Sequence, residues 1–269
     1  MKRPTQITTL VTGASAGIGR ELARLAARDS RMLVIVARRR ERLTALQEEL
    51  AAAHPGLEVL PWACDLADPR ERRALLAGLA AKGIVVDHLI NNAGAGDTGE
   101  FVTLDRARLQ TQLELDVVAV HDLLLAMVPP MVERGYGRIL DLASTAAFQP
   151  LPYMATYAAS KAFVLHLSEA LAVELRPRGV TVTTLCPGRT ATEFFDAAQG
   201  HEGVLFARTP TADAVSVARA GYEAMLAGRR LVVPVLSDRL MAWAARVSPR
   251  RLVLAITGRL FRPTPGSRA

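Results

Sequence analysis

The stretch that decides the fold is 12-TGASAGIG-19, which stands between 7-ITTLV-11 and 20-RELARL-25. The β-branched run before it predicts a strand, and the residues after it predict a helix. Glycines let the backbone approach a pyrophosphate, and the free N–H groups and dipole at a helix start stabilise the charge of such a group. The spacing is GxxxGxG, which differs from the GxGxxG of the standard dinucleotide fingerprint. The stretch therefore predicts a phosphate-binding turn at the start of an α/β chain.

The rest of the chain continues this alternation of strand-like and helix-like segments. We expect strands at 6–11, 32–37, 57–63, 85–91, 137–143, 180–186 and 231–235. We expect helices at 17–28, 40–53, 69–81, 105–132, 155–176 and 211–227. Half of the 269 residues are hydrophobic, which is typical of parallel strands covered on both faces. The pattern predicts a single doubly wound α/β domain of the Rossmann type, with a parallel sheet of about seven strands and helices on both faces.

Tyr157 and Lys161 stand four residues apart in an expected helix, with Ser144 thirteen residues before the tyrosine. Side chains four apart share a helix face, so the ammonium can lie beside the phenol. A nearby cation favours the phenolate and makes proton exchange near neutral pH feasible. Helices also place such pairs on solvated faces, but the chain has three lysines against thirty arginines. A lysine at this position therefore indicates a site that needs a slim ammonium rather than a planar guanidinium.

Together with Asn91-Asn92-Ala93-Gly94 and Pro187-Gly188, these motifs occur in the order seen in the short-chain dehydrogenases/reductases. The chain resembles this family from about residue 7 to residue 192. The resemblance implies hydride transfer between NADPH and a carbonyl carbon, with Tyr157 giving a proton to the carbonyl oxygen. It also implies that Ser144 orients that oxygen, although Thr145 stands beside it, and that Lys161 holds the ribose and lowers the tyrosine pKa. A homodimer or homotetramer is the expected assembly.

The resemblance also places the cofactor. The implied contacts are Gly13, Ser15, Gly17, Ile18, Gly19, Asp65, Leu66, Asn92, Ala93, Gly94, Tyr157, Lys161, Pro187, Gly188 and Thr190. Asp65 and Leu66 match the pair that family members place against adenine, and the loop from Pro187 matches the one that holds the carboxamide. The alternatives are that Asp65 is a plain turn residue and that Ser15 is only a turn hydroxyl.

The end of the second expected strand, 34-VIVARRR-40, carries arginines where NAD-selective sites place an acidic residue. Ala37 occupies the acidic position, and Arg38 and Arg39 follow it. A 2′-phosphate would therefore meet guanidinium groups, and the sequence favours NADP over NAD. The alternative is a solvated basic helix start, although helix starts favour acidic residues.

One position departs from the family pattern. The run 113-LELDVV-118 has Asp116 where the family usually carries an asparagine that binds a proton-relaying water. An aspartate can still accept a hydrogen bond from water, and its charge near Lys161 would change the tyrosine pKa. We include Asp116 among the candidate catalytic residues, with an unrelated position on an amphipathic helix as the equal alternative.

Apolar residues in the segments that flank the active site in similar proteins indicate an apolar substrate. They are Phe148, Met154, Phe194, Phe195, Leu205 and Phe206. Four of them lie in 189–210, the one long irregular connection of the chain, and loops of that length are usually functional lids or disordered. We expect an aliphatic, acyl or polycyclic carbonyl rather than a sugar. The alternative is that these side chains pack a lid onto the core.

The C-terminal part carries the basic charge of the chain. Residues 228–269 contain nine arginines and one acidic residue, Asp238, whereas the whole chain has a net charge of +7. Leu240, Trp243 and Val247 fall on one helical face, and Ser248-Pro249 then marks a new helix start. We divide the chain into a catalytic domain over 1–236 and a basic amphipathic extension over 237–269. Such helices can dock on anionic lipid, but packing against the protein itself or a second subunit is the favoured interpretation.

Other features exclude functions more than they assign them. The five histidines lack metal-ligand spacing, so no metal site is expected. The basic charge comes without a nucleic-acid-binding motif, so no nucleic-acid partner is expected. Cys64 and Cys186 are expected as buried thiols, and the absence of an apolar leader favours the cytoplasm. The alternative to an enzyme is an NADPH-binding sensor or scaffold without turnover, which has no need of the intact Ser-Tyr-Lys set.

Overall fold

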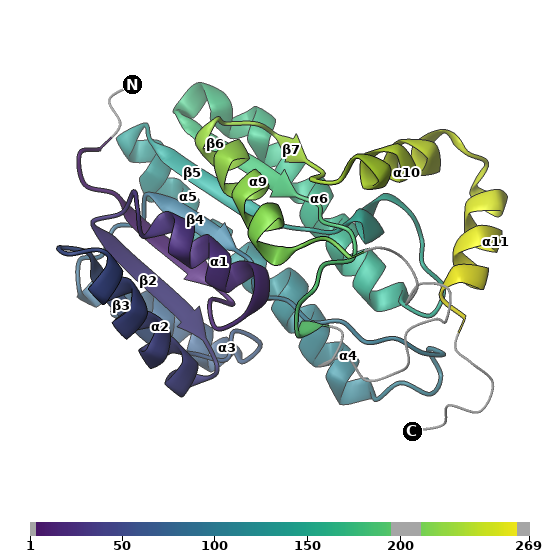
Figure 1. Ribbon diagram of the computed structural model, residues 1–269, viewed down its shortest axis with the longest axis horizontal. Coiled ribbons are helices and arrows are strands. Elements are labelled where there is room, and N and C mark those ends of the chain that lie inside the picture. Colours follow the sequence, from purple (N-terminus) through teal and green to yellow (C-terminus); the bar gives the residue numbers. More distant parts are fainter. Residues whose placement is uncertain (1–3, 195–210, 263–269) are drawn as a thin grey trace.

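The computed structural model describes residues 4–194 and 211–262, which form a seven-stranded sheet with helices on both faces (Figure 1). The strands are β1 (Thr8–Thr12), β2 (Met32–Ala37), β3 (Glu58–Ala63), β4 (His88–Asn91), β5 (Gly137–Leu142), β6 (Val180–Leu185) and β7 (Leu231–Val232). All neighbouring pairs are parallel, in the order β3-β2-β1-β4-β5-β6-β7. The order reverses between β1 and β4, and open α/β sheets bind ligands beyond the strand ends at such a point. The predicted doubly wound sheet is confirmed.

Helices connect the strands at nearly the predicted places. They are α1 (Gly17–Ala26), α2 (Arg40–Ala53), α3 (Pro69–Ala81), α4 (Arg106–Leu113), α5 (Ala119–Arg134), α6 (Ala155–Leu175) and α9 (Ala214–Leu226). The side chain of Asp68 accepts a hydrogen bond from the backbone N–H of Arg70 and so caps α3, which begins with Pro69. β7 is shorter than predicted and ends at Val232.

The sheet is buried on both faces because alternate residues of each strand point to opposite sides. Leu10 and Val34 belong to the core beneath α3, α5 and α6. Val11 and Leu33 belong to the core beneath α1, α2 and α9. This double burial also takes polar strand residues out of solvent, among them Thr9, Asp141 and Thr183. Cys64 and Cys186 are buried free thiols, as the sequence predicts.

The helix predicted over 105–132 is interrupted by a π-helical turn, η1 (Glu114–Val118), between α4 and α5. The sequence analysis missed this turn, because no local pattern marks a single i→i+5 turn; such turns are frequent at functional sites. By length and composition the whole stretch Arg106–Arg134 could cross a membrane. In the fold, its residues Leu123 and Met131 are buried against the sheet, as in the core helix of an α/β domain.

Two helices extend beyond the last strand, and both project from the end of the sheet at β7 (Figure 1). They are α10 (Leu236–Val247) and α11 (Arg250–Leu260), so a new helix does follow Pro249 as predicted. Phe261, which follows α11, is buried with Leu151 and Met154. The hydroxyl of Thr257 on α11 also donates a hydrogen bond to the carbonyl oxygen of Pro150 at 3.2 Å. The inner face of α11 therefore covers the protein's own substrate side, as expected.

Candidate active site

A cleft of about 860 Å³ opens at the carboxyl ends of the strands. Residues that follow each of the strands β1 to β6 line it, because parallel strands deliver their ends to one edge of the sheet. The predicted site residues that line it are Gly13, Ser15, Gly17, Ile18, Gly19, Arg38, Arg39, Asp65, Leu66, Asn92, Ala93, Gly94, Ser144, Tyr157, Lys161, Pro187, Gly188 and Thr190. Of the predicted catalytic and cofactor-binding residues, Asp116 alone does not line the cleft.

The turn after β1 is locked to the turn after β4. Asn92 donates from Nδ2 to the carbonyl oxygen of Thr12 at 2.9 Å, and Thr12 Oγ1 accepts from the backbone N–H groups of Asn92 and Ala93. Gly13 has a φ of 66°, and a Cβ there would lie 2.6 Å from Asn92 Nδ2. Glycine is therefore required at this position for both its backbone conformation and its close approach.

The start of α1 provides an anion site. Its N-cap residue, Ala16, offers no side-chain hydrogen bond to the first turn, so no side chain caps those N–H groups. The same turn lines the cleft with Ser15, Gly17 and Ile18. Uncapped N–H groups and the positive end of the helix dipole match a pyrophosphate. The residues present therefore fit the phosphate groups of a dinucleotide.

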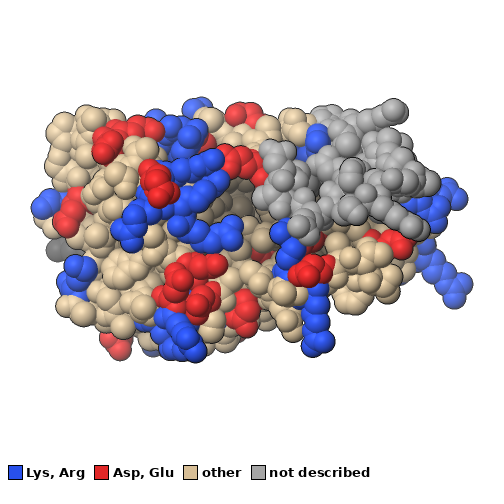
Figure 2. All heavy atoms as spheres, turned by 90° about the horizontal axis from the view of Figure 1, so that it is seen from below, with Lys and Arg blue, Asp and Glu red and all other residues tan. Residues whose placement is uncertain are grey.

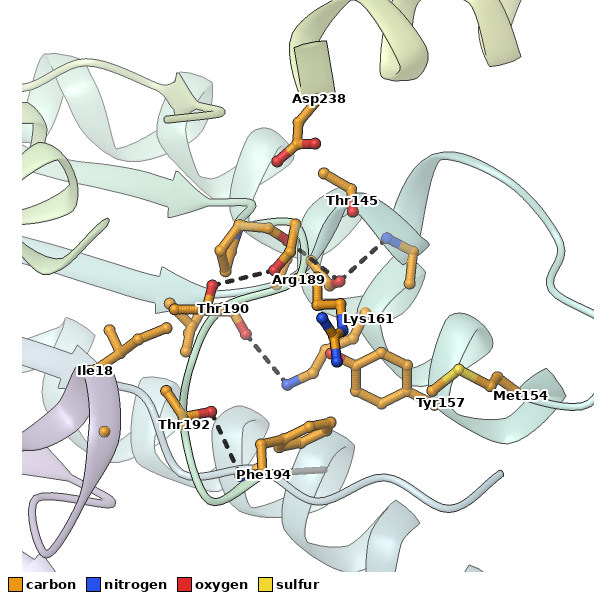
Figure 3. Close-up of a pocket in the computed structure, with 18 of the residues that line it drawn as sticks. Ile18, Thr145, Met154, Tyr157, Lys161, Arg189, Thr190, Thr192, Phe194 and Asp238 are labelled. Atoms are coloured by element: carbon orange, nitrogen blue, oxygen red, sulfur yellow. Dashed lines mark hydrogen bonds between the residues drawn. The ribbon is translucent and has the colours of Figure 1, made fainter. Parts of the chain in front are cut away.

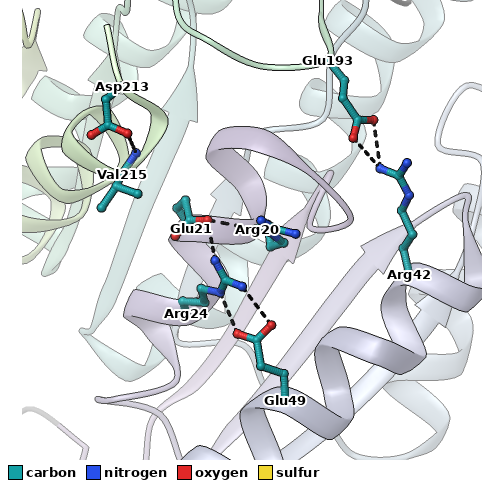
Figure 4. Close-up of polar contacts among 8 residues, drawn as sticks. All are labelled: Arg20, Glu21, Arg24, Arg42, Glu49, Glu193, Asp213 and Val215. Atoms are coloured by element: carbon teal, nitrogen blue, oxygen red, sulfur yellow. Dashed lines mark hydrogen bonds and ion pairs between the residues drawn. The ribbon is translucent and has the colours of Figure 1, made fainter.

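Arginines gather at the end of β2. Arg39 donates to Ser15 Oγ at 3.2 Å and forms an ion pair with Glu193 at 2.9 Å. Arg42 pairs with the same carboxylate at 2.7 Å, as Figure 4 shows. Arg38 is exposed at the rim of the cleft. Figure 2 shows basic side chains beside a hollow on this face of the molecule. The site fits a 2′-phosphate, and the sequence analysis missed Glu193, which binds the same arginines from a distant loop.

Asp65 follows β3 and is engaged in its own turn. Its Oδ1 accepts a hydrogen bond from the backbone N–H of Ala67 at 3.0 Å. The buried Arg72 donates to the carbonyl oxygen of Leu66 at 2.7 Å and pairs with Glu114 and Asp122. Asp65 is therefore a turn residue and also lines the cleft. Arg72, which is not predicted from the sequence as part of the site, holds Leu66 in place through this hydrogen bond.

Ser144, Tyr157 and Lys161 converge at one side of the cleft, where Ser144 and Tyr157 are hydrogen-bonded. Figure 3 shows Tyr157 and Lys161 beside one another. Ser144 Oγ accepts from the backbone N–H of Ala146 at 3.1 Å and donates to the carbonyl oxygen of Pro187 at 3.4 Å. Lys161 Nζ lies 5.8 Å from the centroid of the Tyr157 ring and donates to the carbonyl oxygen of Leu142 at 3.3 Å. The three side chains come from the end of β5 and from α6, which pack side by side. The cleft therefore holds a hydroxyl, a phenol and an ammonium around one space.

The pKa of Tyr157 differs from the sequence-based expectation. Burial raises the pKa of the phenol above its ordinary value, and a hydrogen bond with Ser144 opposes that rise. The negative charge of Asp116 raises the tyrosine pKa further. The lowering of the tyrosine pKa that was expected from Lys161 is not observed, because desolvation of the phenolate has the larger effect. The ring of Phe194 contributes to this apolar setting, with its centroid 5.4 Å from that of Tyr157.

Asp116 lies directly behind Lys161. Its carboxylate is fully buried on η1, accepts hydrogen bonds from the backbone N–H of Ala95 and the hydroxyl of Ser160, and lies 4.0 Å from Lys161 Nζ. Burial raises the pKa of this carboxyl, and the charge of Lys161 opposes that rise. A Cβ at Gly94 would lie 3.0 Å from Lys161 Nζ, so the glycine makes room for the pair. Asp116 is thus in contact with the site and not displaced from it.

The loop after β6 is tied to the C-terminal extension. Asp238 on α10 accepts a hydrogen bond from the backbone N–H of Gly188, and a side chain at Gly188 would overlap the carboxylate. Arg189 and Thr192 of the same loop also line the cleft (Figure 3). None of the side chains of Asp238, Arg189 and Thr192 is predicted as part of the site from the sequence. Asp238 had a visible signal, since it is the single acidic residue of an arginine-rich tail.

Only some of the residues predicted to form an apolar pocket line the cleft. Met154 and Phe194 line the cleft, whereas Phe148 does not and instead lies under the guanidinium of Arg246 at 5.2 Å. Phe195, Leu205 and Phe206 lie outside the described residues. Further apolar lining comes from the C-terminal helices, which the sequence analysis did not assign to the pocket: Met241, Ala245, Leu252, Ile256 and Leu260.

Comparisons with known proteins agree with this geometry. A family model described as short chain dehydrogenase matches residues 7–203. A putative ketoacyl reductase of Streptomyces coelicolor is 36% identical over 199 residues, which cover 71% of this chain and 74% of the relative.

Two solved structures extend the likeness over most of the chain. A short-chain dehydrogenase from Sphingobium yanoikuyae in complex with NADPH is 30% identical, with a TM-score of 0.78 and coverage of 98% of both chains. A bulky-bulky ketone specific alcohol dehydrogenase from Comamonas testosteroni is 28% identical, with a TM-score of 0.76 and coverage of 90% of this chain and 93% of that one.

Proposed function

Because the chain belongs to the short-chain dehydrogenase family, we propose that it is an NADP(H)-dependent oxidoreductase acting on a carbonyl or secondary alcohol. The observation that carries this proposal is the convergence of Ser144, Tyr157 and Lys161 in the cleft that the phosphate-binding turn also lines. A bound nicotinamide supplies or accepts the hydride. The chain supplies the proton, the orientation of the substrate and the binding of the phosphates.

The cofactor is NADP(H) rather than NAD(H). Arg38 and Arg39 stand at the end of β2, and no acidic residue occupies that strand end. Arg39 also contacts Ser15 of the phosphate turn, so its guanidinium lies where a phosphate near the adenine ribose would be held. The Sphingobium relative binds NADPH, which supports the same choice for this chain.

The roles of the catalytic side chains follow from their positions. Tyr157 Oη gives its proton to the substrate oxygen in reduction and takes it back in oxidation. Ser144 donates a hydrogen bond to that oxygen and orients it. Lys161 binds the nicotinamide-side ribose and stabilises the phenolate after proton transfer. Asp116 holds Lys161 by its charge and accepts hydrogen bonds behind it, which is a positioning role.

The substrate is an apolar carbonyl compound, such as an aliphatic, acyl or polycyclic ketone. Met154 and Phe194 line the cleft beside the catalytic side chains, and α10 and α11 supply Met241, Leu252 and Ile256. A cleft lined in this way favours a substrate that buries apolar surface. The names of the Streptomyces and Comamonas relatives refer to a ketoacyl group and to bulky ketones, and both substrate classes suit such a cleft.

The experiment is a panel of ketones with NADPH and with NADH, followed by the absorbance of the reduced nicotinamide. We expect ring and long-chain ketones to be turned over faster than small polar ketones, and NADPH to be preferred. Tyr157→Phe removes the proton donor, so turnover should fall by several orders of magnitude while NADPH binding is kept. Tyr222→Phe is the control, because Tyr222 lies away from the cleft and bonds to Asp29.

Near-normal turnover by Tyr157→Phe would overturn the mechanism. NADPH binding without turnover of any ketone or alcohol in the panel would point instead to a sensor, a reading that no observation in the fold favours. Faster turnover of small polar ketones would overturn the substrate class alone.

The assembly is a homodimer or homotetramer in the cytoplasm. Leu125 on α5 and Val173 on α6 are 61% and 64% exposed, which provides apolar surface for a subunit contact on these two helices. Light scattering coupled to size-exclusion chromatography measures the assembly directly, and a monomer at all concentrations contradicts it.

A further inference from the structure

The outer face of α10 carries large apolar side chains that nothing in the described part of the chain covers. Leu236, Leu240, Trp243 and Val247 recur at helical spacing and are between 61% and 66% exposed. The expected packing of these helices on the protein's own substrate side or a subunit interface holds for the inner face of α11, whereas no described residue of the chain covers this face of α10. Exposed apolar residues are normal when scattered, but four in one stripe mark an interaction surface.

The neighbouring helix α11 extends this surface. Leu252 and Ile256 are 52% and 56% exposed, and both also line the cleft. They therefore lie at the mouth of the cleft, next to the exposed helix α10. We call the six residues Leu236, Leu240, Trp243, Val247, Leu252 and Ile256 the tail surface.

The exposed charges that α10 and α11 themselves carry are positive, and Glu169 of α6 pairs with one of them, Arg246, at 4.0 Å. Arg239, Arg250, Arg251 and Arg259 are exposed on the two helices. The only acidic residue in the described part of the extension is Asp238, whose carboxylate is engaged with the backbone N–H of Gly188. Figure 2 shows basic side chains projecting at the end of the molecule where α11 lies in Figure 1. The surface is thus apolar and strongly cationic.

We propose that the tail surface docks the protein on an anionic lipid surface. Apolar side chains of an amphipathic helix enter the boundary between headgroups and acyl chains, while arginines bind lipid phosphates. Trp243 at the centre of the stripe is a residue type that favours this boundary. A second copy is a poorer occupant, because a two-fold contact through this face would set the arginines of one copy against those of the other. Docking in this way also places the mouth of the cleft at the lipid surface.

The test is flotation of the full-length protein with vesicles of phosphatidylglycerol and phosphatidylcholine, compared with vesicles of phosphatidylcholine alone. We expect binding to the anionic vesicles only, with loss of binding at high salt. Arg250→Gln with Arg251→Gln should weaken binding about 30-fold, because each cation near such a surface contributes about 1 kcal/mol. Leu240→Ser with Trp243→Ser should weaken it by a similar or greater factor.

Two control pairs match these variants. Val85→Ser with Val215→Ser removes apolar side chains that are 48% and 45% exposed elsewhere on the surface. Arg70→Gln with Arg73→Gln removes two exposed arginines of α3. The melting temperature of every variant is measured, and only variants that melt at the temperature of the parent chain are compared. Unfolding then does not mimic loss of binding. The controls should bind vesicles as the parent chain does.

Fluorescence locates the contact. The chain has two tryptophans, and Trp62 packs against Gly78 in the fold. In Trp62→Phe the remaining signal reports Trp243, which should shift to the blue on anionic vesicles and be quenched by brominated lipid. Absence of vesicle binding by the folded full-length protein overturns the proposal. Vesicle binding that the variants of the tail surface leave unchanged also overturns it. A third contrary outcome is an oligomer that dissociates in Leu240→Ser with Trp243→Ser while the parent chain does not bind vesicles. None of these outcomes depends on turnover, so the proposed reaction is tested separately.

Discussion

Asp116 and Lys161 form a buried ion pair, with Oδ1 of the carboxylate 4.0 Å from Nζ of the lysine. The two residues come from η1 and α6, and both side chains are almost fully inaccessible to solvent. The pair faces the phenol of Tyr157 with charges that act in opposite directions. The lysine favours the phenolate, and the carboxylate raises the tyrosine pKa. A family that usually places a neutral asparagine here lacks this second charge.

Asp116→Asn should therefore lower the pKa of Tyr157. Asparagine can still accept from Ala95 and can donate to Ser160, so the local hydrogen bonds survive. Reduction needs the protonated phenol and fails above its pKa, so the alkaline limb of the reduction profile should move to lower pH. The measurement is kcat/KM for ketone reduction against pH. The control is Asp122→Asn, which removes a carboxylate that pairs with Arg72 instead of Lys161. An alkaline limb at the same pH in parent and variant contradicts the effect.

Arg38→Ala and Arg39→Ala should each weaken NADPH binding and leave NADH binding nearly unchanged. A charge-assisted hydrogen bond to a phosphate contributes about 1.5–3 kcal/mol, so the dissociation constant for NADPH should rise about 10- to 150-fold. Titration of each variant with both cofactors, followed by fluorescence, measures this ratio. Arg70→Ala on α3 serves as the matched control. Equal losses for NADPH and NADH would mean that the arginines do not recognise the 2′-phosphate.

Glu193→Gln should strengthen NADPH binding. Hydrogen bonds from Arg39 and Arg42 hold the pKa of Glu193 below its ordinary value, so this carboxylate is ionised and occupies the arginines that a 2′-phosphate needs. The ion pairs are exposed and individually weak, so the gain should be roughly two- to fivefold. Calorimetry with NADPH, with Glu48→Gln of α2 as the control, measures it. Weaker binding by Glu193→Gln would show that the carboxylate supports the cofactor site instead of competing for it.

Asp141→Asn should stabilise the protein at neutral pH. Burial raises the pKa of Asp141 from 3.8 to about 6, although hydrogen bonds from Asn91 and Ser168 oppose the rise. The folded state thus binds this proton more tightly than the unfolded state. The resulting stabilisation is present below the unfolded pKa and is lost as pH rises through the folded pKa, a change of up to about 3 kcal/mol.

The asparagine variant lacks this titration and keeps an amide that can donate to Ser168 Oγ. Urea unfolding at steps between pH ~4 and ~7 should show the parent losing stability relative to the variant as pH rises. Parallel pH dependences in the two proteins would mean that Asp141 does not titrate as proposed.

The sequence alone determined the architecture and those residues of the cleft that belong to the recognised motifs. The strand-turn-helix unit around Gly13, the alternation of segments and the order of the motifs predict the sheet that the structure has. The sequence was sufficient to place Ser144, Tyr157 and Asn92 at the cleft, because each stands at the end of a predicted strand or on a predicted helix. Parallel strands bring such ends to one edge, so local patterns were sufficient.

Only the tertiary structure decided the electrostatics of the site and the fate of the extension. The raised pKa of Tyr157, the pair between Asp116 and Lys161 and the contact of Glu193 with Arg39 depend on burial and on residues 45 to 154 positions apart. The amphipathic pattern of α10 likewise identified an apolar face but not what covers it. Periodicity reports which side chains share a face, whereas desolvation and contact across the chain follow from how all the elements pack together.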